Sequence, residues 1–178
     1  MIGHKITVVG TGYVGMSMAV LLAQHNYVIA LDIDASRVDL INQRKSTVVD
    51  AEIEQYRNEK QLSLKATLDK ADAYKDPSFV VVATPTDYDP ETNYFDTSSV
   101  EAVIDDVLAH NEKAMIVVKS TVPVGFTRSM KDKFKTRAHH FLPGVFTRGT
   151  GAERQSPPVA HHYGQLPRAG ARLCEPVG

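Results

Sequence analysis

Three glycines are the residues of this chain whose types and spacing point most directly to chemistry. Gly10, Gly12 and Gly15 follow an apolar run in the segment V-V-G-T-G-Y-V-G. Where such a G-x-G-x-x-G pattern joins a strand to a helix, the first glycine forms the turn. The second lets a pyrophosphate approach the backbone, and the third lets the helix pack closely on the strand. The spacing therefore predicts a dinucleotide-binding turn, with the unpaired N–H groups of the helix start facing the phosphates.

A carboxylate, Asp32, supplies a second part of such a site. It comes directly after the apolar run 28–31, which is expected to form the next buried strand. A Rossmann unit places an acidic residue roughly 20 residues after the glycines, where it binds the adenosine ribose hydroxyls. Because a carboxylate repels a 2′-phosphate, Asp32 favours NAD over NADP, whereas the cation Arg37 favours the opposite preference.

Hydroxyl side chains follow two further apolar runs. The run 79–83 precedes Thr86, and the run 115–118 precedes Lys119, Ser120 and Thr121. Ligands of an open parallel sheet bind beyond the carboxyl ends of its strands, so these hydroxyls are expected on the same rim as the glycine turn. Such groups orient water or a substrate, but they also form plain turns or cap the next helix. Residue types alone leave both roles open for the second segment.

Strands and helices alternate among the elements that must position these residues. Apolar runs and helical periodicity predict strands at 5–9, 28–31, 62–66, 79–83 and 115–118 and helices at 13–23, 34–42, 51–61, 69–74 and 98–110. An acidic segment at 87–97 is expected to be a loop. This order predicts an α/β fold, a doubly wound parallel sheet of at least five strands.

Composition restricts the class of protein further. The chain has 178 residues, 43% of them hydrophobic, and a net charge of −1, which gives no broad attraction to nucleic acid or membranes. No apolar run reaches the roughly 18 residues that a membrane helix needs, and Met1 leads straight into a strand without a signal peptide. With Cys174 as its single cysteine, the protein is expected to be cytoplasmic.

The character of the chain changes near Arg137. Before it, charged and apolar residues alternate as in an α/β domain, whereas prolines, glycines and two histidine pairs fill the segment beyond. No carboxylate or thiol pattern completes a metal site around those histidines, so no metal is expected. We expect residues 1–136 to form the sheet. Residues 137–178 are expected to be an irregular, disordered tail that leaves the sheet without its next strand.

Several blocks together resemble one family. They are K-I-T-V-V-G-T-G-Y-V-G, L-D-I-D-A-S-R-V-D-L-I-N, L-S-L-K-A-T-L-D, V-V-V-A-T-P-T-D-Y, N-Y-F-D-T and V-V-K-S-T-V-P-V-G-F-T. Up to about Thr136 the chain resembles the N-terminal domain of the bacterial UDP-glucose 6-dehydrogenases, within the UDP-glucose/GDP-mannose dehydrogenase family. Sister enzymes that oxidise UDP-N-acetylmannosamine or GDP-mannose share the architecture, but N-Y-F-D-T and K-A-T-L-D are more similar to the UDP-glucose branch.

The resemblance implies a Rossmann fold, a homodimer and oxidation of the UDP-glucose C6 alcohol to a carboxylate with two NAD molecules in succession. A cysteine of these enzymes captures the aldehyde, and water hydrolyses the resulting thioester. The residues that the resemblance assigns are Gly10, Gly12, Val14 and Gly15 at the pyrophosphate, Asp32 and Arg37 near the adenosine ribose, and Thr86 and Thr121 near the nicotinamide half. It also gives Thr121 a catalytic role, which is to help hold the hydrolytic water.

The chain departs from the family pattern after Thr136. The block S-P-E-F-L-R-E-G with its catalytic glutamate, the substrate domain, the catalytic lysine and the cysteine nucleophile are absent from the sequence. Cys174 lacks the glycine-rich surroundings of the family cysteine. The chain is therefore expected to be the cofactor-binding part of an NAD-dependent sugar-nucleotide dehydrogenase, without turnover of its own. A stand-alone NAD-binding module and a dehydrogenase of a related nucleotide sugar are the alternatives, and the family blocks disfavour a small hydroxy acid as substrate.

The codons of the tail allow a specific explanation of this departure. Residues 139–141, H-H-F, can be encoded by CAT-CAT-TTT, which one base later encodes I-I-F. In the same shifted frame, residues 142–149 permit S-P-E-F-L-R-E-G, the absent block, and residues 150–163 permit R-A-L-S-D-N-L-H-P-S-R-I-I-T, which also resembles the family. We therefore expect the segment 137–178 to be an out-of-frame translation caused by one extra base near Arg137.

Overall fold

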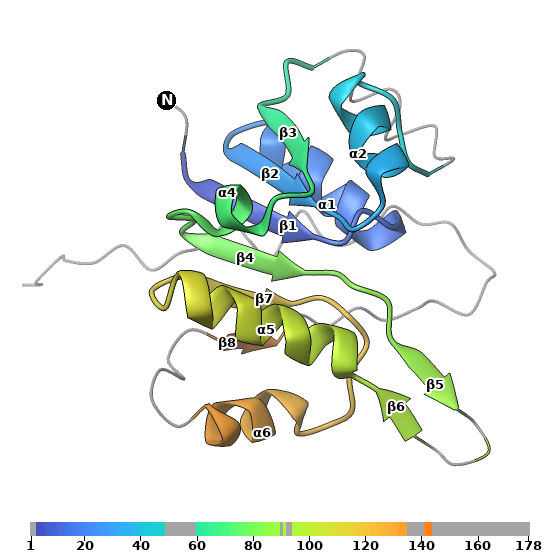
Figure 1. Ribbon diagram of the computed structural model, residues 1–178, viewed down its shortest axis with the longest axis vertical. Coiled ribbons are helices and arrows are strands. Elements are labelled where there is room, and N and C mark those ends of the chain that lie inside the picture. The colour runs from blue at the N-terminus through green and yellow to red at the C-terminus, as the bar shows by residue number, and fades with distance from the viewer. Residues whose placement is uncertain (1–2, 49–59, 90, 92–93, 135–140, 144–178) are drawn as a thin grey trace, which may run out of the picture. The chain divides into compact units, whose positions relative to one another are not determined.

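The computed structural model describes residues 3–48, 60–89, 91, 94–134 and 141–143, which contain a six-stranded sheet in the order β3-β2-β1-β4-β7-β8 (Figure 1). Its strands are β1 (Lys5–Val9), β2 (Tyr27–Leu31), β3 (Leu64–Thr67), β4 (Phe79–Val82), β7 (Met115–Val118) and β8 (Phe141–Pro143). Every neighbouring pair is parallel. Because the order runs outward from β1 in both directions, the sheet is doubly wound, and the predicted fold class is confirmed.

Helices cover both faces of this sheet. They are α1 (Tyr13–Ala23), α2 (Ala35–Asn42), α4 (Lys70–Tyr74), α5 (Ser98–His110) and α6 (Phe126–Lys133). Side chains of α4, α5 and α6 form one apolar cluster with β1, β2, β4 and β7, whereas α1 and α2 pack with strand residues of the opposite face. In Figure 1, α4 and α5 lie in front of the sheet and α1 lies behind it.

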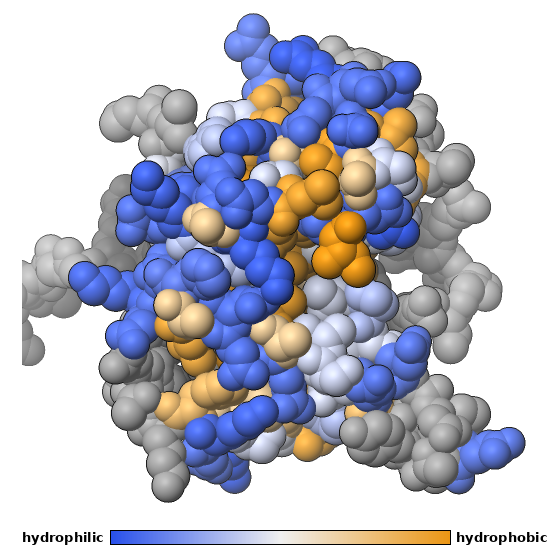
Figure 2. Space-filling view, in the orientation of Figure 1, coloured by the Kyte–Doolittle hydropathy of each residue, from blue (hydrophilic) through white to orange (hydrophobic). Residues whose placement is uncertain are grey.

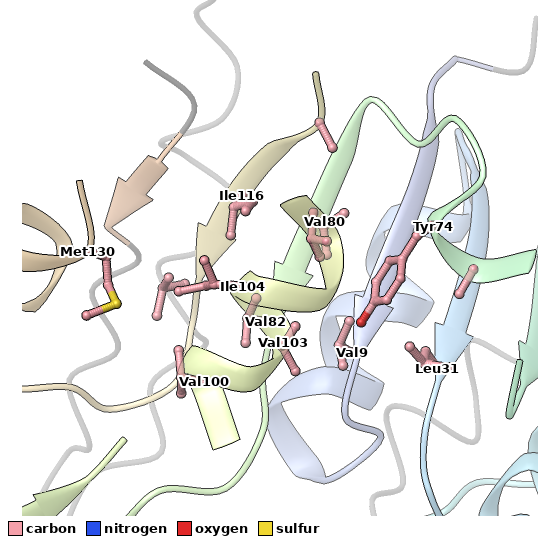
Figure 3. Packing of buried hydrophobic residues seen from close by; sticks show 14 of the residues in the cluster. Val9, Leu31, Tyr74, Val80, Val82, Val100, Val103, Ile104, Ile116 and Met130 are labelled. Atoms are coloured by element: carbon pink, nitrogen blue, oxygen red, sulfur yellow. The ribbon is translucent and has the colours of Figure 1, made fainter. Parts of the chain in front are cut away.

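The register of the strands explains why they appear as unbroken apolar runs in the sequence. Successive side chains of a strand point to opposite faces, so Val8 joins the cluster of α1 and Val9 joins that of α5. Val9 is paired with Val82 of β4. Figure 3 shows both on the face of the sheet that α5 covers with Val103. A strand that is buried on both faces is therefore apolar at most of its positions. Each fully buried valine of this kind contributes about 1.5–3 kcal/mol.

Two predicted segments, 87–97 and 51–61, either differ from the prediction or lie mostly outside the described residues. The predicted loop at 87–97 is wrong, because it contains an antiparallel hairpin of β5 (Asp87–Asp89) and β6 (Tyr94–Asp96) that extends from the sheet (Figure 1). Aspartate and tyrosine alternate in D-Y-D, which is a signal of a strand, and Y-F-D contains two adjacent aromatic residues of the kind that strands favour. Of the predicted helix at 51–61, residues 51–59 lie outside the described residues, and Lys60 and Gln61 are not helical.

The expectation that the sheet lacks its next strand is also wrong. Strand β8 lies beyond Thr136 and pairs with β7, joining Ile116 to Phe141 and Val118 to Pro143. The open edge of β7 offers unpaired backbone groups, and a short segment with apolar side chains is sufficient to pair with them. The remainder of 137–178, including both histidine pairs and Cys174, lies outside the described residues.

Within the part of the chain that is described, no helix has the length and apolar character needed to span a membrane. The same residues contain no group of three or more histidine, cysteine, aspartate or glutamate side chains arranged to hold a metal ion.

Candidate functional site

The residues singled out by the sequence meet at one edge of the sheet. Gly10 comes directly after β1 and Asp32 directly after β2, and the segments that carry Thr86 and Thr121 follow β4 and β7. Since these strands are parallel neighbours, their carboxyl ends form one rim. The arrowheads of β1 and β4 point the same way in Figure 1. The predicted shared rim is confirmed.

The three glycines of the turn meet different surroundings. Gly10 has φ of +89°, and a Cβ there would lie 2.7 Å from the carbonyl oxygen of Ala83. A Cβ on Gly15 would lie 1.8 Å from the carbonyl oxygen of Gly10, so α1 packs directly on the turn. Gly12 differs, because a Cβ there would meet no atom within 4 Å. The fold itself therefore requires Gly10 and Gly15, whereas the space in front of Gly12 is open to a ligand.

The start of α1 carries uncompensated positive polarity. Gly12 is its N-cap and has no side chain to cap the helix, and the first turn contains no acidic residue. The N–H of Met16 donates to the carbonyl of Gly12 at 2.8 Å, but the N–H of Val14 donates to no described residue. Free N–H groups and the helix dipole together favour a bound anion. These features fit the pyrophosphate of a dinucleotide.

Asp32 is fixed by its neighbours and held in its ionised form. One carboxylate oxygen, Oδ2, accepts hydrogen bonds from the backbone N–H of Thr11 at 2.7 Å and from its hydroxyl at 2.5 Å. The other oxygen accepts from the N–H of Asp34 at 3.1 Å. Burial raises the pKa of Asp32, but the bonds from Thr11 and Asp34 outweigh that effect and leave the pKa below its ordinary value. The carboxylate keeps lone pairs that can accept from two ribose hydroxyls.

Thr11 is a residue of this site that sequence reasoning missed. It occupies a variable position of the glycine pattern and is fully buried. Its carbonyl in turn accepts a hydrogen bond of 2.7 Å from the hydroxyl of Thr47, beyond α2. A hydroxyl residue between two glycines is a weak signal, since only the folded structure brings it to Asp32.

Arg37 lies on α2 between two carboxylates. Its guanidinium is 3.9 Å from Asp32 Oδ2 and 3.7 Å from Asp34 Oδ2, and its side chain is 45% exposed. Both pairs are loose and reached by solvent, so each stabilises the fold little. They nevertheless place two negative charges beside the guanidinium of Arg37.

The threonines of the other half of the rim are joined to each other. Thr86 Oγ1 donates a hydrogen bond of 2.8 Å to the carbonyl oxygen of Thr121. The side chain of Thr121 is exposed, and its hydroxyl has no hydrogen-bond partner among the described residues. One hydroxyl therefore connects the loops after β4 and β7, and the other is free to meet a ligand or water.

Apolar side chains are unusually exposed along the same rim. Ile33, directly after Asp32, is 96% exposed, and Leu68, directly after β3, is 50% exposed. Tyr13 at the start of α1 and Val124 in the loop after β7 are exposed as well. Figure 2 shows apolar atoms gathered beside the carboxyl end of β1. Sequence reasoning missed these residues.

The fold and the rim together define a dinucleotide-binding domain of the Rossmann type. Residues 4–145 match the family described as "UDP-glucose/GDP-mannose dehydrogenase family, NAD binding domain". A UDP-glucose 6-dehydrogenase of Streptococcus pneumoniae is 49% identical over 139 residues, covering 78% of this chain and 35% of that protein. The UDP-glucose 6-dehydrogenase of Campylobacter jejuni is 40% identical over 148 residues, covering 82% of this chain and 38% of that protein.

Solved structures agree with the fold. A UDP-glucose dehydrogenase from Pyrobaculum islandicum superimposes with a TM-score of 0.67 at 22% identity, covering 82% of this chain and 37% of that chain. The chain belongs to the UDP-glucose/GDP-mannose dehydrogenase family, a family of oxidoreductases, and the cofactor of its matched domain is NAD. It spans little more than a third of the length of the relatives that it matches.

Proposed function

We propose that this chain binds NAD along the rim of its sheet and is the cofactor-binding part of a UDP-glucose 6-dehydrogenase. The observation that carries the proposal is the open space at Gly12 in front of the uncapped start of α1, beside the ionised Asp32. A pyrophosphate and an adenosine ribose need this combination of free N–H donors and carboxylate acceptor.

Each site residue then has a defined role. The main chain at Gly10, Gly12, Val14 and Gly15 holds the pyrophosphate, Asp32 accepts from the ribose hydroxyls, Arg37 lies at the edge of the ribose site, and Thr86 and Thr121 face the nicotinamide half. The exposed side chain of Ile33 offers an apolar surface to the adenine ring. When bound, NAD supplies the hydride acceptor for oxidation of an alcohol. The free hydroxyl of Thr121 supports a catalytic role in holding the water that releases the product.

The substrate proposal follows from the relatives. Those at 49% and 40% identity are UDP-glucose 6-dehydrogenases, whereas a GDP-mannose 6-dehydrogenase is 34% and a UDP-N-acetyl-D-mannosamine dehydrogenase 32% identical. We therefore favour UDP-glucose, oxidised to UDP-glucuronate in the cytoplasm. The chain lacks the glutamate block, lysine and cysteine of the family pattern, so we expect binding without turnover.

Calorimetry tests this function. NAD should bind more tightly than NADP, and Asp32→Ala should abolish that preference, because the carboxylate is the group that repels a 2′-phosphate. Equal affinity for both cofactors in the unaltered chain would contradict the role of Asp32. Steady NADH formation from UDP-glucose by the pure protein would contradict the expected loss of turnover.

A frameshift near Arg137 remains our proposal for the origin of the tail. In the shifted frame that encodes S-P-E-F at 142–145, positions 141 and 143 still encode phenylalanine and proline. Two of the three residues of β8, Phe141 and Pro143, are thus the same in both frames. This identity accounts for a family match and a strand that extend beyond Thr136. Resequencing the DNA around codon 137 tests the idea, and a shifted frame that meets an early stop or lacks the glutamate block would reject it.

A noncatalytic NAD-binding module is the second candidate function. It is favoured if resequencing finds a single intact frame through codon 137, since a frameshift then does not account for the absence of the glutamate block.

A further inference from the structure

Two serines join the loops after β4 and β7 beneath the threonines of the rim. Ser120 is the second residue after β7 and is buried, with 8% of its surface exposed. Its hydroxyl donates a hydrogen bond of 2.7 Å to the carbonyl oxygen of Thr84. The backbone N–H of Ser120 donates to the carbonyl of Val82, at 3.2 Å. Ser120 therefore bonds the last residue of β4 through its main chain and Thr84, in the loop after β4, through its side chain.

The second serine acts on the same loop from another element. Ser99, the second residue of α5, lies with its hydroxyl 2.6 Å from the carbonyl oxygen of Pro85 and 3.2 Å from the hydroxyl of Thr84. A serine hydroxyl carries one proton. Since the carbonyl of Pro85 can only accept, Ser99 donates to it and accepts from Thr84.

These contacts fix Thr84 and Pro85, the two residues that precede Thr86. The carbonyl of Thr84 accepts a bond from Ser120 in the loop after β7, and the carbonyl of Pro85 accepts one from Ser99 of α5, so the backbone leading to Thr86 is held from two sides. Thr86 is then placed to bond the carbonyl of Thr121 at 2.8 Å. A loop without such contacts would lose conformational freedom each time a ligand bound, and that loss weakens binding.

We propose that Ser99 and Ser120 are positioning residues for the nicotinamide half of NAD. They act through the segment 84–86 and touch neither the pyrophosphate turn nor Asp32. The proposal rests on the proposed NAD binding, because it assigns these serines to one half of that same site. Substitution of either serine should therefore weaken binding of the nicotinamide half of NAD and leave binding of the adenosine half unchanged.

The test compares NAD with ADP-ribose, which has the pyrophosphate and both riboses but no nicotinamide. Calorimetry on the whole chain should show about fivefold weaker NAD binding for Ser99→Ala and for Ser120→Ala, the effect expected of one lost hydrogen bond, with ADP-ribose binding unchanged. Ser129→Ala is the matched control, because its hydroxyl makes the same kind of bond, 2.8 Å to the carbonyl of Phe126, within α6 and not to the segment 84–86. That control should change neither affinity.

Several outcomes would overturn the proposal. Equal losses for NAD and ADP-ribose, or no loss for either, would show that the serines do not act on the nicotinamide half. The same conclusion follows if the unaltered chain binds NAD no more tightly than ADP-ribose. If Ser120→Ala fails to fold, the partly exposed Ser99 provides the decisive variant.

Failure of the proposed function is distinguishable from failure of this inference. If the unaltered chain binds neither ligand, NAD binding itself is wrong, and hydrogen exchange then decides about the serines. Both variants should speed exchange at the amides of Thr84 and Thr86, and unchanged exchange there overturns the inference.

Discussion

The two halves of the rim are built by different means. At the ends of β1 and β2, main-chain contacts fix the glycine turn, and a buried carboxylate is held by donors from Thr11 and Asp34. At the ends of β4 and β7, side-chain hydroxyls connect two loops, and the hydroxyl of Thr121 is left exposed. The adenosine half is thus organised by the fold itself, whereas the nicotinamide half depends on a few side-chain bonds. Substitutions that disturb the contacts of Gly15 and Asp32 should therefore act strongly on folding, whereas loss of the Thr86 bond should act mainly on binding.

Gly15→Ala should have the largest effect, because it attacks the contact on which the adenosine half is built. Its Cβ would lie 1.8 Å from the carbonyl oxygen of Gly10, so α1 must move away from the turn. Overpacking of this kind costs about 3 kcal/mol or more when the obstacle is backbone. Urea denaturation followed by circular dichroism measures the loss. Unchanged stability would show that α1 does not pack on the turn as described.

Asp32→Ala should follow, at about 1–3 kcal/mol, because the buried N–H and hydroxyl of Thr11 would lose their acceptor. The pH dependence gives a sharper measurement. The pKa of Asp32 is lowered from 3.8 on folding, so the unfolded chain binds the proton more readily and the contribution of Asp32 to stability is lost as the pH falls below 3.8.

Asp32→Asn should therefore flatten the fall in stability below that pH. Asp39→Asn is the control, since it makes the same change of charge on the exposed side of α2. An identical acid profile for Asp32→Asn and the unaltered chain would contradict the lowered pKa.

Gly12→Ala tests whether Gly12 serves ligand binding, in contrast to Gly10 and Gly15, which the fold requires. A Cβ at Gly12 meets no atom within 4 Å, so the loss of stability should be less than about 1 kcal/mol. Affinity for both NAD and ADP-ribose should fall by about tenfold or more, equivalent to about 1.4 kcal/mol, because the methyl group occupies the approach of the pyrophosphate. Full affinity in this variant would place the pyrophosphate elsewhere on the protein.

Sequence patterns predicted the adenosine half better than the nicotinamide half. Buried strands and the glycine turn leave local signals, and Asp32 follows from its spacing. The bond from Thr11 to Asp32 spans 21 positions and the contact of Ser99 with Thr84 spans 15, so no local pattern predicts either.

The same limit applies to the elements that sequence patterns missed. Strand β8 has three residues, too few for periodicity, and its pairing is decided by the open edge of β7. In the β5 and β6 hairpin only the three residues of β5 alternate, which is too short a pattern to stand out among the acidic residues of the segment.

Thr86→Val should have the smallest effect and yet distinguish the two halves most directly. It keeps the shape of the side chain and removes one bond, 2.8 Å long, to the carbonyl of Thr121. On a partly exposed loop that bond is worth about 0.5–1 kcal/mol, which corresponds to a two- to fivefold loss of NAD affinity. ADP-ribose affinity should not change. Thr121→Val is the comparison, because its hydroxyl bonds no described residue and its removal should leave thermal stability unaltered. If Thr86→Val weakened the binding of ADP-ribose as much as that of NAD, the two halves of the rim would be coupled. The side-chain bonds after β4 and β7 would then not serve the nicotinamide half alone.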